Sequence, residues 1–214
     1  MMTTNTNPTF TQHPTRTEHQ SPSELLTQVP ATRESDKPSE DMGARIISLC
    51  EPVGPETAIR IIRELLSYEA EDPATPIHMQ IFSPGGCVVS GLAIIDAMQH
   101  ISSPVFTYAI GFAASMGAVI LACGEKNHRY ILPHSRVMIH QASGSAGGTM
   151  DNVRATLAFQ SALEQDNDLL LSAATGRSIA EIQNASRVDN WMSARASVDF
   201  GLVDHILEPA LSPA

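Results

Sequence analysis

From Ala44 onward, the spacing of apolar residues changes repeatedly between that of a strand and that of a helix. Ile77 to Phe82 alternates as a strand does, whereas Leu92, Ile95 and Met98 recur at helical spacing. Strands that alternate with helices in this way are typical of a layered α/β fold. The expected elements, in chain order, are a strand at 46–49, a helix opened by Pro55, a strand at 77–82, a helix before His100, a strand at 105–110 that ends at Gly111, a helix at 115–123, strands at 129–132 and 136–140, a helix at about 150–174, a helix capped by Ser178 and Glu181, a helix at about 194–200, and a closing strand through Leu202, Val203 and Ile206.

The N-terminal segment differs from the rest of the chain. Residues 1–40 are rich in Thr, Pro, Gln and Ser and show no sustained apolar period. Such a segment cannot bury enough surface to offset the entropy lost on ordering. We therefore expect residues 1–40 to be a disordered tail or a removable propeptide. Residues 44–208 are expected to form one folded domain, which suits a chain of 214 residues.

Composition and charge argue against several classes of function. The net charge of -10 disfavours a nucleic-acid groove, which needs clustered Lys and Arg. The three cysteines are widely spaced and form no Cys-x-x-Cys pair, so neither a disulfide framework nor a metal or redox site is expected. The apolar runs are too short to span a bilayer, and no secretory signal is expected. We therefore expect a cytoplasmic protein with no nucleic-acid or membrane partner.

Ser115 is a candidate nucleophile because of where it lies. In the segment Gly111–Gly117 it stands between an expected strand end and an expected helix start, among small residues. Small neighbours let a substrate backbone approach the hydroxyl, and a helix N-terminus stabilises developing negative charge. A serine that merely caps a helix is the commoner explanation of such a segment when it is considered alone.

The Ser83-Pro84-Gly85-Gly86 turn is a second candidate element of the same site. Glycine adopts backbone angles that other residues avoid, so this turn can present amide hydrogens outward. One amide here and one just after Ser115 would form an oxyanion hole, which stabilises the charged intermediate of acyl transfer. A plain tight turn is the alternative.

A histidine and an aspartate are candidates for the remaining roles. His140 follows an apolar strand and precedes a loop rich in glycine and serine, as expected at the edge of a cleft. A hydrogen-bonded structural histidine explains that position equally well. Asp189 lies beside the single tryptophan, Trp191, which could partly desolvate its carboxylate. The residues alone do not separate Asp189 from Asp199 or Asp204.

Several of these segments, in this order, resemble the proteolytic subunit of the Clp ATP-dependent protease, the ClpP family of serine peptidases. The resemblance covers roughly residues 44–207, including the separations between Ser115, His140 and Asp189. Its motifs are Ser83-Pro84-Gly85-Gly86, Ala113-Ala114-Ser115-Met116-Gly117, Leu132-Pro133, Ser135-Arg136-Val137-Met138-Ile139-His140-Gln141 and Gly201-Leu202-Val203-Asp204.

The resemblance implies a role for each site residue. Ser115 would be the nucleophile, His140 the general base and Asp189 the acid that orients the base, with no metal or cofactor. The oxyanion donors would be the backbone amides of Gly86 and Met116. The implied reaction is that of a serine endopeptidase cleaving unfolded polypeptides to short peptides.

The resemblance also implies an architecture and partners. The fold would be the ClpP/crotonase-like α/β fold of repeated ββα units, with a protruding handle helix after Gly148. Seven-membered rings would stack into a double ring enclosing a chamber. Because the chain shows no P-loop, a partner AAA+ ATPase would unfold and feed the substrates. A paralogous ClpP subunit is a further expected partner.

Two features depart from the family pattern. The arginine that usually precedes the catalytic aspartate is replaced by Val188, and Arg187 lies one residue earlier. The stretch after Val29-Pro30 also lacks an expected amphipathic helix. These departures suit an alternative function, a non-catalytic or weakly active ring subunit that regulates an active paralogue. An acyl-CoA enzyme of the crotonase type and a Ser–Lys peptidase rank lower, the latter because Lys126 is the sole lysine of the expected domain.

Overall fold

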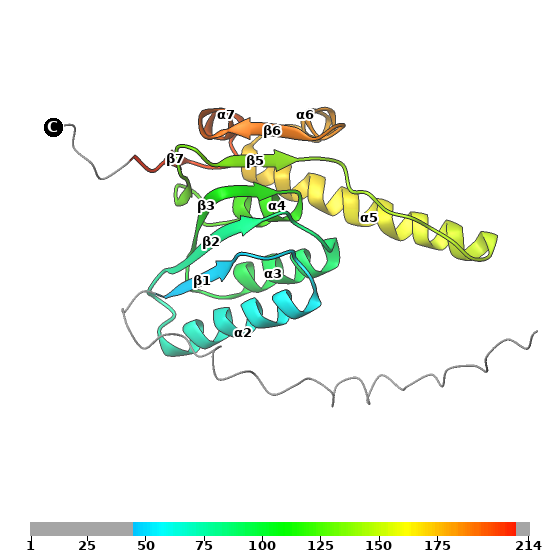
Figure 1. Cartoon of the computed structure of the whole chain (residues 1–214). Helices are drawn as coiled ribbons and strands as arrows, with labels where there is room; N and C mark the ends of the chain where they lie inside the picture. The colour runs from blue at the N-terminus through cyan, green and yellow to red at the C-terminus, as the bar shows by residue number, and fades with distance from the viewer. Residues whose placement is uncertain (1–44, 209–214) are drawn as a thin grey trace, which may run out of the picture. The chain divides into compact units, whose positions relative to one another are not determined.

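A computed structural model describes residues 45–208, so the expected tail at 1–40 and the Val29-Pro30 segment lie outside the described residues. The labels below are those of Figure 1. The helices and strands, in chain order, are β1 (Ile46–Leu49), α2 (Pro55–Glu71), β2 (Ile77–Ser83), α3 (Val88–His100), β3 (Val105–Ala114), α4 (Met116–Ala122), β4 (Arg129–Ile131), β5 (Arg136–Ile139), α5 (Met150–Thr175), α6 (Ile179–Ala185), β6 (Asn190–Ser193), α7 (Ala194–Phe200) and β7 (His205–Ile206).

The strands of the described chain form one sheet that is parallel except at β6. Its main path runs β1-β2-β3-β4-β7, and β5 branches from β3. The first half of β3 pairs with β4, where Thr107 lies opposite Arg129, and its last residues pair with β5, where Ala114 lies opposite Met138. β6 then pairs antiparallel with β5. The α/β fold predicted from the sequence is confirmed, and the structure shows that its sheet is mostly parallel.

Helices α2 and α3 lie beside each other along one side of this sheet (Figure 1). Pro55 occupies the first turn of α2, as predicted, because its missing N–H is not needed there. The buried face of α2 carries Ala58, Ile61 and Leu65 at helical spacing. Each Ile or Leu side chain that is fully buried in this way contributes on the order of 1.5–3 kcal/mol relative to exposure.

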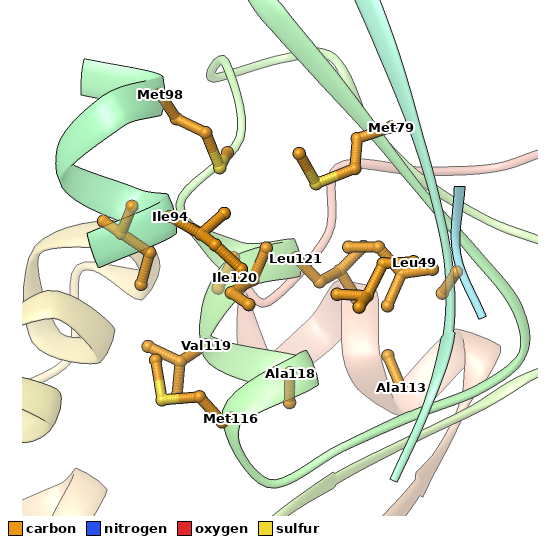
Figure 2. Close-up of a cluster of buried hydrophobic side chains, with 14 of the residues drawn as sticks. Leu49, Met79, Ile94, Met98, Ala113, Met116, Ala118, Val119, Ile120 and Leu121 are labelled. Carbon is orange, nitrogen blue, oxygen red and sulfur yellow. The ribbon is translucent and has the colours of Figure 1, made fainter. Parts of the chain in front are cut away.

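Helix α4 lies in the core. All of its residues, Met116 to Ala122, are buried, as expected for a helix that is apolar on every side. Figure 2 shows Ile120 and Leu121 of α4 between Ile94 of α3 and Leu49 of β1. Packing on several sides fixes the helix, and therefore fixes the residue that precedes it, Ser115.

Helix α5 is the protruding helix expected after Gly148. Thr149 caps its start by accepting a hydrogen bond from the Asn152 amide, and Gly176, with φ 74°, ends it. Its buried residues, Asp168 and Leu171, both lie in the C-terminal half, and the N-terminal half extends beyond the sheet (Figure 1). Among residues 45–208, neither α5 nor another helix combines the length and the apolar character needed to cross a membrane.

The structure differs from the sequence prediction at three places. β3 does not end at Gly111 but continues to Ala114, because Gly111 takes φ 71° and its amide donates to Ser135 Oγ, while the following residues pair with β5. The strand β6 was not predicted. The closing strand is short, and Leu202 and Val203, which were expected in it, are buried before it starts.

Candidate active site

Ser115 occupies a strained turn between β3 and α4. Its backbone has φ 54° and ψ -124°, a region that residues other than glycine seldom occupy. The turn is held by the Ser115 amide, which donates to the carbonyl of Met138 at 2.8 Å, and by the Ala118 amide, which donates to the carbonyl of Ser115 at 2.9 Å. Strain maintained in this way is concentrated at functional sites.

The hydroxyl of Ser115 is not used to cap α4. Ser115 stands at the N-cap position, but its side chain forms no capping hydrogen bond. Its Oγ lies instead 2.9 Å from Nε2 of His140. The capping explanation left open by the sequence therefore fails for this residue.

His140 connects Ser115 to Asp189. Its Nδ1 lies 2.9 Å from Oδ1 of Asp189. An ionised carboxylate only accepts hydrogen bonds, so Nδ1 carries the proton, and Nε2 is left to accept a hydrogen bond from the Ser115 hydroxyl. The structure thus brings the three side chains predicted from the sequence into one hydrogen-bonded row.

Two strand pairings explain why these residues meet. In the antiparallel ladder of β5 and β6, Ile139 lies opposite Asn190. The next rung places His140, which follows Ile139, opposite Asp189, which precedes Asn190. The parallel pairing of β3 with β5 brings the end of β3, and hence Ser115, to the same place. The row of side chains is therefore a consequence of sheet register.

The two glycines of the Ser83–Gly86 turn lie against the Ser115 turn and the chain before α2. A Cβ on Gly85 would stand 2.7 Å from the amide nitrogen of Met116, and one on Gly86 would stand 2.3 Å from the carbonyl oxygen of Val53. Both positions also have positive φ, 84° and 147°. These contacts require glycine at each position.

The backbone pairing sets the direction of the Gly86 amide. Val53 donates to the carbonyl of Gly85 and accepts from the amide of Cys87, both at 2.8 Å. In such a parallel bridge, the N–H of the residue between them, Gly86, points away from Val53. Gly86, Ser115 and Met116 all border one cavity of about 620 Å³. The two residues whose amides are predicted as oxyanion donors therefore border the same cavity as the serine.

The other two candidate aspartates are engaged elsewhere. Asp199 forms an exposed ion pair with Arg195 at 3.1 Å. Asp204 binds Arg129 with both carboxylate oxygens, at 2.9 Å and 2.6 Å. Burial opposes ionisation of Asp204, but the hydrogen bonds and charge of Arg129 outweigh it and hold the pKa of Asp204 below its usual value. The structure brings neither aspartate to His140.

Some residues of the cavity wall were not found from the sequence. Asp168 on α5 and Ser186 after α6 both border the cavity and are buried. The only sequence signal for Asp168 was its spacing of three residues from Leu171, which places both on one face of α5. Because the other residues of that face are mostly polar, the apolar periodicity of the sequence did not reveal it as a buried face.

A serine at a strained strand–helix turn, joined through a histidine to an aspartate, is the geometry that serine hydrolases use. Comparison with known proteins agrees with this class. The family described as Clp protease matches residues 31–210 of the chain. The ATP-dependent Clp protease proteolytic subunit 1 of Prochlorococcus marinus subsp. pastoris (strain CCMP1986 / NIES-2087 / MED4) is 43% identical over 164 residues, which cover 77% of this chain and 84% of that protein.

The chain belongs to the Clp protease family. This membership places it among the peptidases, a class of hydrolases, and confirms the resemblance found in the sequence.

Proposed function

We propose that this chain is a serine endopeptidase in which Ser115 attacks the carbonyl carbon of a peptide bond. His140 Nε2 takes the hydroxyl proton as the new bond forms and returns it to the leaving amine. Asp189 keeps the proton on Nδ1 and stabilises the imidazolium. A water molecule then attacks the acyl-enzyme by the same route and releases the second product. The observation that carries this proposal is the row of two 2.9 Å contacts from Ser115 through His140 to Asp189.

The oxyanion of the tetrahedral intermediate would be held by the amides of Gly86 and Met116. The Gly86 amide points away from Val53, and Met116 is the first residue of α4, so its amide has no acceptor within the helix. Both residues border the cavity beside Ser115. Preorganised amides of this kind typically contribute about 10²–10³-fold to kcat each.

Family membership and the surface of α5 support a proposal for the substrates and the assembly. We expect stacked seven-membered rings whose chamber admits unfolded chains delivered by an AAA+ ATPase. Met150, Leu157 and Phe159 are large apolar side chains of α5, and all are exposed in the isolated subunit. Large exposed apolar residues gathered on one protruding helix indicate a surface that is covered by another chain. A second copy of this chain, or a paralogous subunit, would cover it.

Hydrolysis of short fluorogenic peptides by the full-length protein tests the proposal, because short peptides need no unfolding. Ser115→Ala should abolish turnover while the oligomer mass stays the same. Ser67→Ala is the matched control, since Ser67 is an exposed serine of α2 outside the cavity. Turnover by Ser115→Ala equal to that of Ser67→Ala would contradict the triad. Normal assembly without hydrolysis in the unmutated chain would favour the non-catalytic ring subunit.

A further inference from the structure

The cavity beside Ser115 is a candidate specificity pocket. It has a volume of about 620 Å³ and is bordered by Ser115 and by both proposed oxyanion donors. When a carbonyl is held by these donors, the side chain of the residue that carries the carbonyl extends into the adjoining space. The lining of the cavity therefore determines which side chain is accepted on the N-terminal side of the cleaved bond.

The part of the wall formed by α4 and its neighbours is apolar. It is lined by Val88, Met116, Val119, Ile139 and Leu171. Met116 follows Ser115 directly and Val119 lies three residues further along α4, so the apolar wall starts beside Ser115. This part suits a run of methylene groups.

The part of the wall formed by α5 is polar and carries two carboxylates. Ser161, Glu164 and Asp168 border the cavity from positions three and four residues apart, which places them on one face of the helix. Asp168 is only 8% exposed, and its Oδ2 accepts a hydrogen bond from Gln183 Nε2 at 2.9 Å. None of the ion pairs formed within residues 45–208 includes Asp168. A buried aspartate without a cation is unusual, because burial of an unpaired charge is costly.

An independent observation in the same cavity indicates a polar ligand. Ser186 borders the cavity and is 5% exposed, and its Oγ has no hydrogen-bond partner in the described chain. The buried Oδ1 of Asn167, which also borders the cavity, is unpartnered as well. Most buried polar atoms in proteins are satisfied, so two unsatisfied ones around one cavity indicate that the polar part of this wall is not completed by the subunit alone.

We propose that this cavity selects lysine or arginine on the N-terminal side of the cleaved bond. The aliphatic stem would lie along the apolar wall, and the cationic end would reach Asp168. Besides His140, the ionisable groups on the wall are Glu164, Asp168 and the exposed Arg187, so the α5 side carries only negative charge. This inference rests on the proposed function, since it assumes that Ser115 attacks the peptide.

Peptidyl phosphonates that differ in one side chain test the selection without requiring turnover. Probes carrying a lysine-like, an arginine-like or a leucine-like group next to the phosphorus would be added to the full-length assembled protein. The rate of Ser115 labelling would be followed by intact mass. A charge-assisted hydrogen bond gained in the pocket predicts labelling roughly tenfold to hundredfold faster for the basic probes.

Asp168→Asn should remove most of that preference, lowering the rate of labelling by the basic probes far more than the rate of labelling by the leucine-like probe. Asp166→Asn is the matched control, because Asp166 is an exposed carboxylate of the same helix that does not border the cavity. If Asp168→Asn fails to assemble, two measurements on the unmutated protein still test the inference. The first is the relative rate of labelling by the three probes, and the second is the C-terminal residue of the peptides released from an unfolded protein substrate. Release of peptides ending mainly in Lys or Arg supports the inference.

The possible failures are distinguishable. Labelling by the leucine-like probe as fast as by the basic probes overturns the selection but leaves Ser115 as nucleophile. A basic preference that survives Asp168→Asn overturns the assignment of Asp168. Absence of labelling by all three probes contradicts the proposed function itself.

Discussion

The carboxylate of Asp189 contacts the imidazole of His140 at 2.9 Å, yet the Asp189 side chain is 65% exposed while that of His140 is 28% exposed. Asp189, the proposed orienting acid, is therefore the least covered member of the row. In the isolated subunit, little besides the register of β5 and β6 holds it. Its contribution to activity should depend on geometry and on whatever covers it in the assembly.

Asp189→Asn should reduce kcat by about 10⁴-fold, the loss seen when a triad carboxylate is neutralised and the histidine takes the wrong tautomer. Peptide hydrolysis by the assembled variant measures this. Asp199→Asn is the matched control, because Asp199 forms only an exposed pair with Arg195. A loss of only a few-fold in Asp189→Asn would show that another group orients His140.

Gly86→Ala should abolish peptide hydrolysis. The added Cβ would stand 2.3 Å from the Val53 carbonyl oxygen, and alanine resists φ 147°. The amide at this position would move out of reach of the oxyanion. Gly147→Ala, where a Cβ meets no atom within 4 Å, should retain activity. Equal activity of the two variants would argue against Gly86 as an oxyanion donor.

Elements with local sequence signals could be predicted, whereas elements that depend on strand pairing could not. The helix predicted at about 150–174 is observed as α5, Met150–Thr175, and the reciprocal hydrogen bonds of Ser178 and Glu181 confirm the predicted capping box. β6 carried no such signal, since only Met192 of its four residues is buried.

The sequence around each candidate aspartate also could not show which of them contacts His140. Asp189 reaches His140 only because β6 pairs with β5, a contact between segments 49 residues apart in the chain. The sequence pattern of Asp189 and its neighbours does not encode that pairing. The resemblance to a known family supplied it instead.

Asp204→Asn should destabilise the fold by about 3–5 kcal/mol at neutral pH, because it leaves the Arg129 guanidinium buried beside a neutral partner. Arg129 also donates to the carbonyls of Ala122 and Ala174, so the pair joins four segments of the chain. Thermal or urea unfolding measures the difference.

The pH dependence of this difference has a defined sign. An unfolded aspartate has a pKa of about 3.9, and Arg129 holds the pKa of Asp204 in the folded state below that value. The stabilisation by the pair is therefore complete above that value and is lost as the pH falls through the lower pKa of the folded state. The free energies of unfolding of the original chain and of Asp204→Asn should approach each other below about pH 4. A difference that stays constant on acidification would contradict a lowered pKa.

Val188, which precedes Asp189, is 74% exposed, and a valine has no charge with which to form the ring–ring contact that the resemblance implies at this position. We expect weaker association between rings and an activity that rises with protein concentration. Val188→Arg should raise activity at low concentration about two- to fivefold, the scale of an exposed ion pair. Oligomer mass should be followed in parallel.

Leu66→Arg is the charge-matched control for Val188→Arg, since Leu66 is an exposed apolar residue of α2. Concentration-independent activity from a stable double ring of the unmutated chain would show that valine at position 188 does not weaken assembly.

The most direct test of the account is the site at which the full-length protein reacts with a fluorophosphonate, located by mass spectrometry of the labelled peptide. The strained turn and the 2.9 Å contact with His140 predict a single adduct on Ser115, absent in Ser115→Ala and strongly reduced in His140→Ala. An adduct on another residue, or no adduct in an assembled and folded protein, would contradict Ser115 as the nucleophile.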